Sequence, residues 1–221
     1  LLAWDAPGYG GSTPLPEPNP LAKDYATALK AFCNANAVSN MVLIGHSLGA
    51  MIAARFAIDF PNMVDQLILV APATGYAHAT VEKRNAVIAE RNGLMERLGP
   101  EGMANVRAAN LLANKDNPEK LALVRQNMSL LTPEGYRQAV HLLAFGDIIA
   151  DIARYSGPVD ILCGSEDLIT PPEKVRKIAN AAPRGTYTEI PGAGHACYID
   201  QPGLFADRIR PIVMAQHERN S

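Results

Sequence analysis

The sequence lacks most of the features that mark specialised classes of protein. Its 221 residues include only three cysteines, Cys33, Cys163 and Cys197, and no Cys-x-x-Cys spacing. This odd, dispersed set predicts neither a disulfide framework nor a thiolate metal site, and it favours a reducing compartment. Twenty basic residues stand against 22 acidic ones, so no positive excess indicates nucleic acid or an anionic membrane as a partner. The expected partner is a small molecule.

Long apolar runs are also missing. Residues 31–54 carry no charge, but asparagine, serine, histidine and glycine residues interrupt them. Nowhere do about eighteen apolar residues follow one another, as a membrane span requires. No basic region, apolar run and cleavage site form a signal peptide, so we expect a cytoplasmic protein. Hydrophobic residues make up 48% of the chain, which is enough for one large domain with its own core.

Short apolar runs separated by helical patterns predict an α/β fold. Four apolar runs bounded by turn residues are expected to be strands, at residues 1–4, 41–44, 67–70 and 159–163, and the alternating residues 186–190 are expected to be a fifth. Helical patterns cover residues 24–35 and 48–60. This order of strand, loop and helix predicts a mostly parallel sheet with helices on both faces.

The segment 72–156 differs from the rest because its apolar pattern is helical throughout. Four helices are predicted there: one over residues 81–98, and three that begin at Pro100, Pro118 and Pro133, where proline and a following acid suit a helix start. We expect residues 1–71 and 157–221 to form the core, and residues 72–156 to form a cap over the carboxyl edge of the sheet. The alternative is a packing appendage.

Gly45-His46-Ser47-Leu48-Gly49 matches the G-x-S-x-G nucleophile elbow and lies between a predicted strand and a predicted helix. The tight turn needs small residues beside the serine, a demand that Gly45 and Gly49 are expected to meet. Leu48 would offer its backbone N–H to an oxyanion at the start of the helix. The alternative is a glycine-bounded turn with an incidental serine.

A serine nucleophile needs a base, and the base needs an orienting acid. His195 follows the last predicted strand in a glycine-rich loop and is the preferred base. The other histidines, His46, His78, His141 and His217, are less well placed. Asp167 follows the preceding strand and is the preferred acid, with Glu166 as its rival. The chain order Ser47, Asp167, His195 is the order of the α/β hydrolases.

With these residues in place, the sequence resembles the α/β-hydrolase fold family. It is most similar to the capped subgroup of enol-lactone hydrolases, carbon–carbon bond hydrolases and haloperoxidase-like esterases that need no cofactor. The resemblance covers the whole chain and runs through four segments, at residues 4–12, 45–49, 164–171 and 192–202. It implies Ser47 as nucleophile, Asp167 as acid and His195 as base. Tyr136 with Asp147 looks more like the enol-lactonase branch.

One departure from the family stands at the beginning of the chain. The resemblance implies three earlier strands, and a His-Gly loop after the third that supplies a second oxyanion donor. Nothing in the sequence matches them, so we expect an N-terminally truncated chain. The family's third strand lies between those at residues 1–4 and 41–44, so the first of these is expected to pair abnormally or to float free. A missing oxyanion donor lowers turnover about a hundred- to a thousandfold.

The expected function is hydrolysis of an ester, lactone or related carbonyl through an acyl-enzyme, without metal or cofactor. Carbon–carbon cleavage of a vinylogous diketone is one alternative. An inactive fragment or a non-catalytic binding relative is another. The substrate depends on which side chains of the cap face the serine, with Arg107, Tyr136 and His141 as the polar candidates. The sequence does not indicate the oligomeric state.

Overall fold

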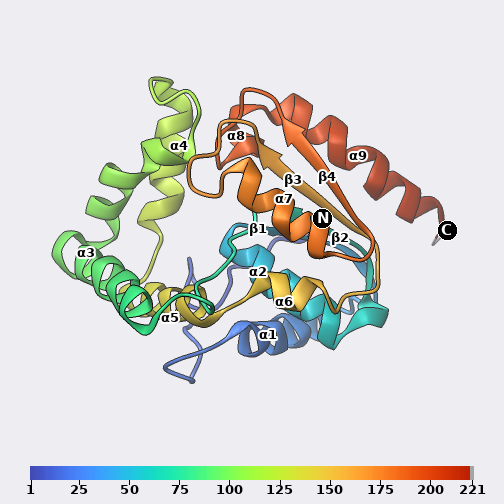
Figure 1. Ribbon diagram of the computed structural model, residues 1–221, viewed down its shortest axis with the longest axis horizontal. Coiled ribbons are helices and arrows are strands. Elements are labelled where there is room, and N and C mark those ends of the chain that lie inside the picture. The colour runs from blue at the N-terminus through green and yellow to red at the C-terminus, as the bar shows by residue number, and fades with distance from the viewer. Residues whose placement is uncertain (220–221) are drawn as a thin grey trace.

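The computed structural model describes the backbone of residues 1–219 and the side chains of residues 1–215. Within this part of the chain, four strands form one parallel sheet in the order β1-β2-β3-β4 (Figure 1). They are β1 (Met41–His46), β2 (Val64–Val70), β3 (Val159–Gly164) and β4 (Gly185–Ile190). Four of the five predicted strands are therefore confirmed, each within a few residues of its expected bounds.

The fifth predicted strand is absent. Residues 1–6 take no regular secondary structure, and Leu1 and Leu2 are exposed. Within the described residues, this end of the chain makes its one isolated bridge at Tyr9, with Leu131 and not with the sheet. The prediction of a strand at residues 1–4 was wrong, because an extended segment without a partner has no ladder to join. The expectation that this segment would not pair regularly with residues 41–44 is confirmed.

Helices cover both faces of the sheet. The first group, α1 (Ala22–Ala35), α2 (Leu48–Asp59), α6 (Ile148–Ile152) and α7 (Pro172–Ala181), shares one hydrophobic cluster with one face. The other face packs against α9 (Pro202–Arg219). Successive residues of β2 alternate between the two clusters, with Leu67 in the first and Ile68 in the second. A strand buried on both faces reads as a continuous apolar run for this reason.

Three longer helices come between β2 and β3 and lie beside the sheet (Figure 1). They are α3 (Val81–Arg107), α4 (Pro118–Ser129) and α5 (Pro133–Phe145). Pro118 and Pro133 begin their helices as predicted, whereas the predicted start at Pro100 is a kink inside α3, where Gly99 has a φ of 64°. Two 3₁₀ turns, η1 (Pro61–Met63) and η2 (Ala108–Leu111), and the short α8 (Cys197–Asp200) complete the elements.

The last helix of this segment behaves differently from the other three. α6 packs mainly against α2 and α7, which belong to the helices that cover one face of the sheet. None of the helices described over residues 1–219 is both long enough and apolar enough to cross a membrane.

Candidate active site

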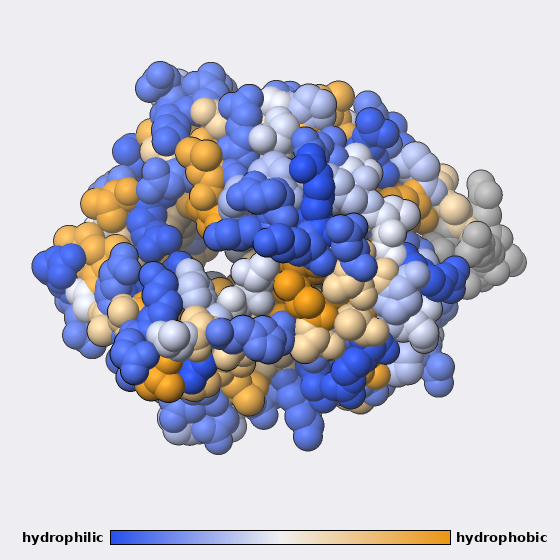
Figure 2. Space-filling model, viewed as in Figure 1, coloured by the Kyte–Doolittle hydropathy of each residue, from blue (hydrophilic) through white to orange (hydrophobic). Residues whose placement is uncertain are grey.

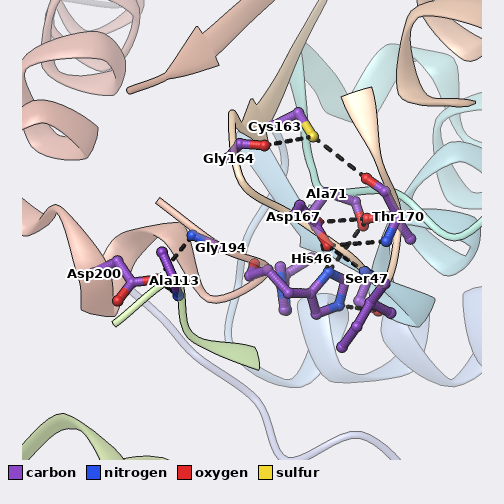
Figure 3. A network of polar contacts seen from close by, with 12 residues as sticks. His46, Ser47, Ala71, Ala113, Cys163, Gly164, Asp167, Thr170, Gly194 and Asp200 are labelled. Atoms are coloured by element: carbon purple, nitrogen blue, oxygen red, sulfur yellow. Dashed lines mark hydrogen bonds and ion pairs between the residues drawn. The ribbon is translucent and has the colours of Figure 1, made fainter. Parts of the chain in front are cut away.

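The three residues predicted from the sequence come together at the carboxyl edge of the sheet. Ser47 follows β1 directly, Asp167 lies on the loop after β3, and His195 lies on the loop after β4. In a parallel sheet the carboxyl ends of all strands meet at one edge, which is where α/β proteins bind their ligands. Figure 3 shows Ser47, Asp167 and Thr170 gathered around this point, with His46 beside them.

Hydrogen bonds join the three side chains in a continuous chain. His195 Nε2 lies 2.9 Å from Ser47 Oγ, and His195 Nδ1 lies 2.8 Å from Asp167 Oδ2. Asp167 and His195 are both buried. The rival acid, Glu166, is exposed and takes no part in this arrangement. The geometry therefore selects Asp167.

The turn that carries Ser47 is tight. Ser47 has a φ of 53°, which side chains rarely adopt, and its N–H donates to the Val70 carbonyl of β2 at 2.9 Å. A Cβ on Gly45 would lie 2.6 Å from the Gly49 carbonyl oxygen, so no side chain fits there. The matching expectation for Gly49 was wrong, because a Cβ at that position meets nothing within 4 Å. A Cβ on Gly49, in the first turn of α2, would point into open space.

The Asp167 carboxylate receives four hydrogen bonds. Oδ1 accepts from the backbone N–H groups of Ile169 and Thr170, at 2.8 and 2.9 Å. Oδ2 accepts from His195 Nδ1 and, at 2.7 Å, from the Thr170 hydroxyl. Burial acts to raise the pKa of this carboxyl, but the bonds from His195 and Thr170 outweigh it and hold the pKa below its usual value. The carboxylate is therefore charged at neutral pH and fixed in orientation.

His46 supports His195 from the other side. The two imidazole rings lie 4.8 Å apart, and His46 Nε2 lies 3.0 Å from the His195 carbonyl oxygen. Burial and the neighbouring imidazole of His195 lower the pKa of His46 to about 4. A neutral His46 facing a carbonyl donates through Nε2–H, so it fixes the backbone of His195. His46 therefore supports the base and does not replace it, in line with the preference for His195.

A second polar cluster ties the loop of His195 to the segment between α3 and α4. Asp200 Oδ2 accepts from the backbone N–H groups of Ala113 and Gly194, both at 2.8 Å. In Figure 3 this cluster of Asp200, Ala113 and Gly194 lies apart from Ser47. The Ala196 N–H adds a bond to the Leu111 carbonyl at 2.8 Å. The position of the histidine loop therefore depends on the segment between β2 and β3.

A cavity of about 240 Å³ opens between Ser47 and the helices α3, α5 and α7. In the space-filling view a hollow lies near the middle of the face, between the group of α3 to α5 and the region of α7 (Figure 2). Of the polar residues predicted to face the serine, Arg107 and Tyr136 line this cavity. His141 does not, because its Nδ1 lies 3.3 Å from the Pro20 carbonyl and its ring packs on Phe145.

The remaining candidates of the sequence lie elsewhere. Asp147 caps α6 and pairs with the exposed His78 at 2.6 Å, so it does not accompany Tyr136 in the cavity. The side chain of His217 falls outside the described residues. Among the side chains that are described, no group of three or more His, Cys, Asp or Glu residues is arranged to hold a metal ion.

Sequence reasoning missed the roles of Thr170, His46 and Asp200. For Thr170 a signal existed. An aspartate on a loop often accepts hydrogen bonds from residues two and three positions later, and Thr170 stands three positions after Asp167. For His46 and Asp200 no local signal exists. Their partners lie on other loops, and only the folded chain brings them together.

Comparison with known proteins identifies relatives of this arrangement. Residues 1–202 match the family described as serine aminopeptidase, S33. A protein of Klebsiella pneumoniae (strain 342) named "Putative carbamate hydrolase RutD" is 25% identical over 215 residues, which cover 93% of this chain and 77% of that protein.

Solved structures agree with the sheet and helix arrangement. A thermophilic esterase from Thermogutta terrifontis has a TM-score of 0.81 and 26% identity, over 94% of this chain and 77% of its own. The enol-lactonase from Burkholderia xenovorans has a TM-score of 0.78 and 17% identity, over 94% and 78% of the two chains, a level that shows the fold alone. The family match and these neighbours together show that this chain is an α/β-fold hydrolase that belongs to the serine aminopeptidase, S33 family.

Proposed function

We propose that the protein hydrolyses an ester, lactone or related carbonyl of a small molecule through an acyl-enzyme. Ser47 is the nucleophile, His195 the base and Asp167 the orienting acid. The observation that carries this proposal is the unbroken series of bonds from Ser47 Oγ to His195 Nε2, at 2.9 Å, and from His195 Nδ1 to Asp167 Oδ2, at 2.8 Å. Ser47 and His195 both line the cavity described above, so a ligand in it can reach the nucleophile and the base.

The mechanism follows from the direction of these bonds. As Ser47 Oγ attacks the carbonyl carbon, His195 Nε2 takes the hydroxyl proton, and the Asp167 carboxylate stabilises the imidazolium that forms. The tetrahedral intermediate collapses when His195 returns this proton to the leaving group. Water then enters, loses a proton to His195 and attacks the acyl carbon. Release of the acid restores the Ser47 hydroxyl.

The oxyanion of the tetrahedral intermediate is held by the backbone N–H of Leu48. This N–H belongs to the first residue of α2, where an amide has no acceptor within the helix. The helix dipole adds a favourable field at the same place. We assign no second donor within the described residues, and one donor alone supports turnover about a hundred- to a thousandfold below that of two.

Residues 72–156 act in this proposal as a cap that shapes the cavity over a core of residues 1–71 and 157–221. Side chains of α3 and α5 line the cavity opposite Ser47, which supports this role for those helices. Because α6 packs mainly against α2 and α7 and contributes no residue to the cavity, the working part of the cap consists of α3 to α5. The substrate would enter as a small molecule, without metal or cofactor.

Labelling with a fluorophosphonate tests the proposal and separates an enzyme from a binding relative. Wild-type protein should be labelled at Ser47 and should hydrolyse p-nitrophenyl esters, whereas Ser47→Ala should do neither. Ser39→Ala is the matched control, because Ser39 lies on an exposed loop before β1, where its hydroxyl donates to Asn40 Oδ1. Hydrolysis that survives in Ser47→Ala at the wild-type rate would refute the mechanism.

A further inference from the structure

The cavity beside Ser47 has an unbalanced charge. Its lining contains Arg91 from the first part of α3, Arg107 from the end of α3, and Lys174 from α7. No aspartate or glutamate lines it. The whole chain carries 20 basic and 22 acidic residues, so three cations without an anion are not a consequence of a basic composition. The concentration of positive charge is a property of this cavity.

These three cations have no partner of their own. Within the described part of the chain, their side chains make neither an ion pair nor a hydrogen bond. Some arginines elsewhere in the protein are paired, such as Arg55 with Asp59 and Arg84 with two backbone carbonyls, whereas the cavity offers its cations no such partner. A concave, partly apolar site with charge of one sign focuses its field on a ligand of the opposite sign.

Tyr136 gives an independent indication. Its hydroxyl is buried, has no hydrogen-bond partner, and belongs to a residue that lines the same cavity. A buried hydroxyl without a partner costs free energy, and such groups in folded proteins call for an explanation such as a ligand. Of the five buried side-chain atoms without a partner in the described residues, only the Tyr136 hydroxyl belongs to a residue that lines this cavity, and a ligand oxygen that reaches it would accept its hydrogen bond.

We propose that the acyl substrate carries a carboxylate, which Arg91, Arg107 and the Tyr136 hydroxyl bind while Ser47 attacks the carbonyl at the other end. This inference rests on the proposed function and adds the class of its substrate. Apolar side chains that line the same cavity, among them Met103 and Val140, would contact the carbon chain of the acid. Lys174 lies exposed at the rim and attracts the anion toward the cavity.

A pair of chromogenic esters tests this specificity. Mono-p-nitrophenyl glutarate carries the carboxylate, and p-nitrophenyl pentanoate has the same five-carbon acyl chain without it. Charge-assisted hydrogen bonds of the usual strength predict that kcat/KM favours the glutarate ester by about tenfold to a hundredfold. Arg107→Met and Arg91→Met should each lower kcat/KM for the glutarate ester at least about ten times more than for the pentanoate ester. Arg97→Met is the matched control, because Arg97 is an exposed cation of α3 outside the cavity.

Calorimetric binding of glutarate to Ser47→Ala separates this inference from the proposed function. Glutarate binding that is lost in the double variant Ser47→Ala/Arg107→Met supports the carboxylate site even if wild-type protein hydrolyses neither ester. If both esters are hydrolysed equally well, or if Arg107→Met lowers both rates alike, the carboxylate site is refuted while the hydrolase mechanism stands. The inference is also overturned if Ser47→Ala does not bind glutarate and the wild-type protein shows no preference for the glutarate ester over the pentanoate ester.

Discussion

Replacement of Thr170 by valine removes the hydroxyl that donates to the Asp167 carboxylate and that also lies 3.2 Å from His195 Nδ1. Thr170 is buried, and its Oγ lies 2.7 Å from Asp167 Oδ2 and 3.1 Å from the Ala71 carbonyl oxygen. Valine has the same shape, so the space stays filled. The carboxylate keeps its two backbone donors and His195, but it loses its hydroxyl donor.

The size of the effect follows from the charge of the acceptor. A hydrogen bond to a charged group contributes about 1.5–3 kcal/mol, and a buried acceptor that loses its donor is penalised within the same range. We expect Thr170→Val to lower the free energy of unfolding by about 2 kcal/mol at neutral pH. Thr170→Ser keeps the donor and loses one methyl group, so about 1 kcal/mol is expected for this control.

The dependence on pH identifies the cause. A carboxyl with a lowered pKa in the folded state contributes stability that is present above its unfolded pKa, near 3.9, and is lost as the pH falls through the folded pKa. Thr170→Val should reduce that contribution. The difference in stability between wild type and Thr170→Val should therefore be largest at neutral pH and should narrow below about pH 4.

Urea denaturation followed by far-UV circular dichroism at several pH values measures both quantities. The reasoning fails if Thr170→Val is as stable as Thr170→Ser at neutral pH. It also fails if the difference from wild type stays as large at pH values well below about 4 as it is at pH 7, because the lost interaction would then not involve the charged carboxylate.

Three further outcomes are expected. Gly45→Ala should unfold at a lower temperature than wild type, because the added Cβ would lie 2.6 Å from a backbone oxygen. Gly49→Ala should melt within a few degrees of wild type, because a Cβ there meets nothing within 4 Å. Equal melting temperatures of the two variants would contradict this. Because the pKa of His46 falls to about 4, the unfolded chain binds more protons between about pH 6.5 and 4, and stability should fall by at most about 3 kcal/mol as the pH drops through this window. Urea denaturation of His46→Gln should show a shallower pH slope, and an unchanged slope would exclude His46 as the source. Asp200→Ala should lower the free energy of unfolding by about 2 kcal/mol and lower the esterase activity, since the backbone amides of Ala113 and Gly194 lose their acceptor. If the folded variant keeps wild-type activity, the loop of His195 does not need the bonds to Asp200.

The sequence predicted the sheet and most of its surroundings because the relevant signals are local. Strands β2 and β3 are apolar runs buried on both faces, β1 is a shorter apolar run, and β4 shows an alternating pattern at the edge of the sheet. Proline at the first position identified α4 and α5. The strand expected at residues 1–4 failed because its formation depends on a neighbour, which an apolar run alone does not provide.

The order of Ser47, Asp167 and His195 along the chain was enough to place them at one edge of the sheet. That placement follows from the geometry of parallel strands, whose carboxyl ends point the same way. The choice between Asp167 and Glu166 was different. Adjacent residues on a turn point in different directions, and the contacts of Thr170 and His195 decide which carboxylate is buried.

The sequence by itself therefore predicted the fold class, the strands after which the candidate site residues stand, and the choice of Ser47 and His195. These depend on periodicity and on spacing along the chain. Only the tertiary structure decided between Asp167 and Glu166, and only it revealed the contact of His46 with His195, the bond from Asp200 to the segment after α3, and the presence of Arg91, Arg107 and Tyr136 in one cavity. Each of these depends on distances between side chains from separate helices and loops. Such distances arise when the elements pack, and no pattern within one element records them.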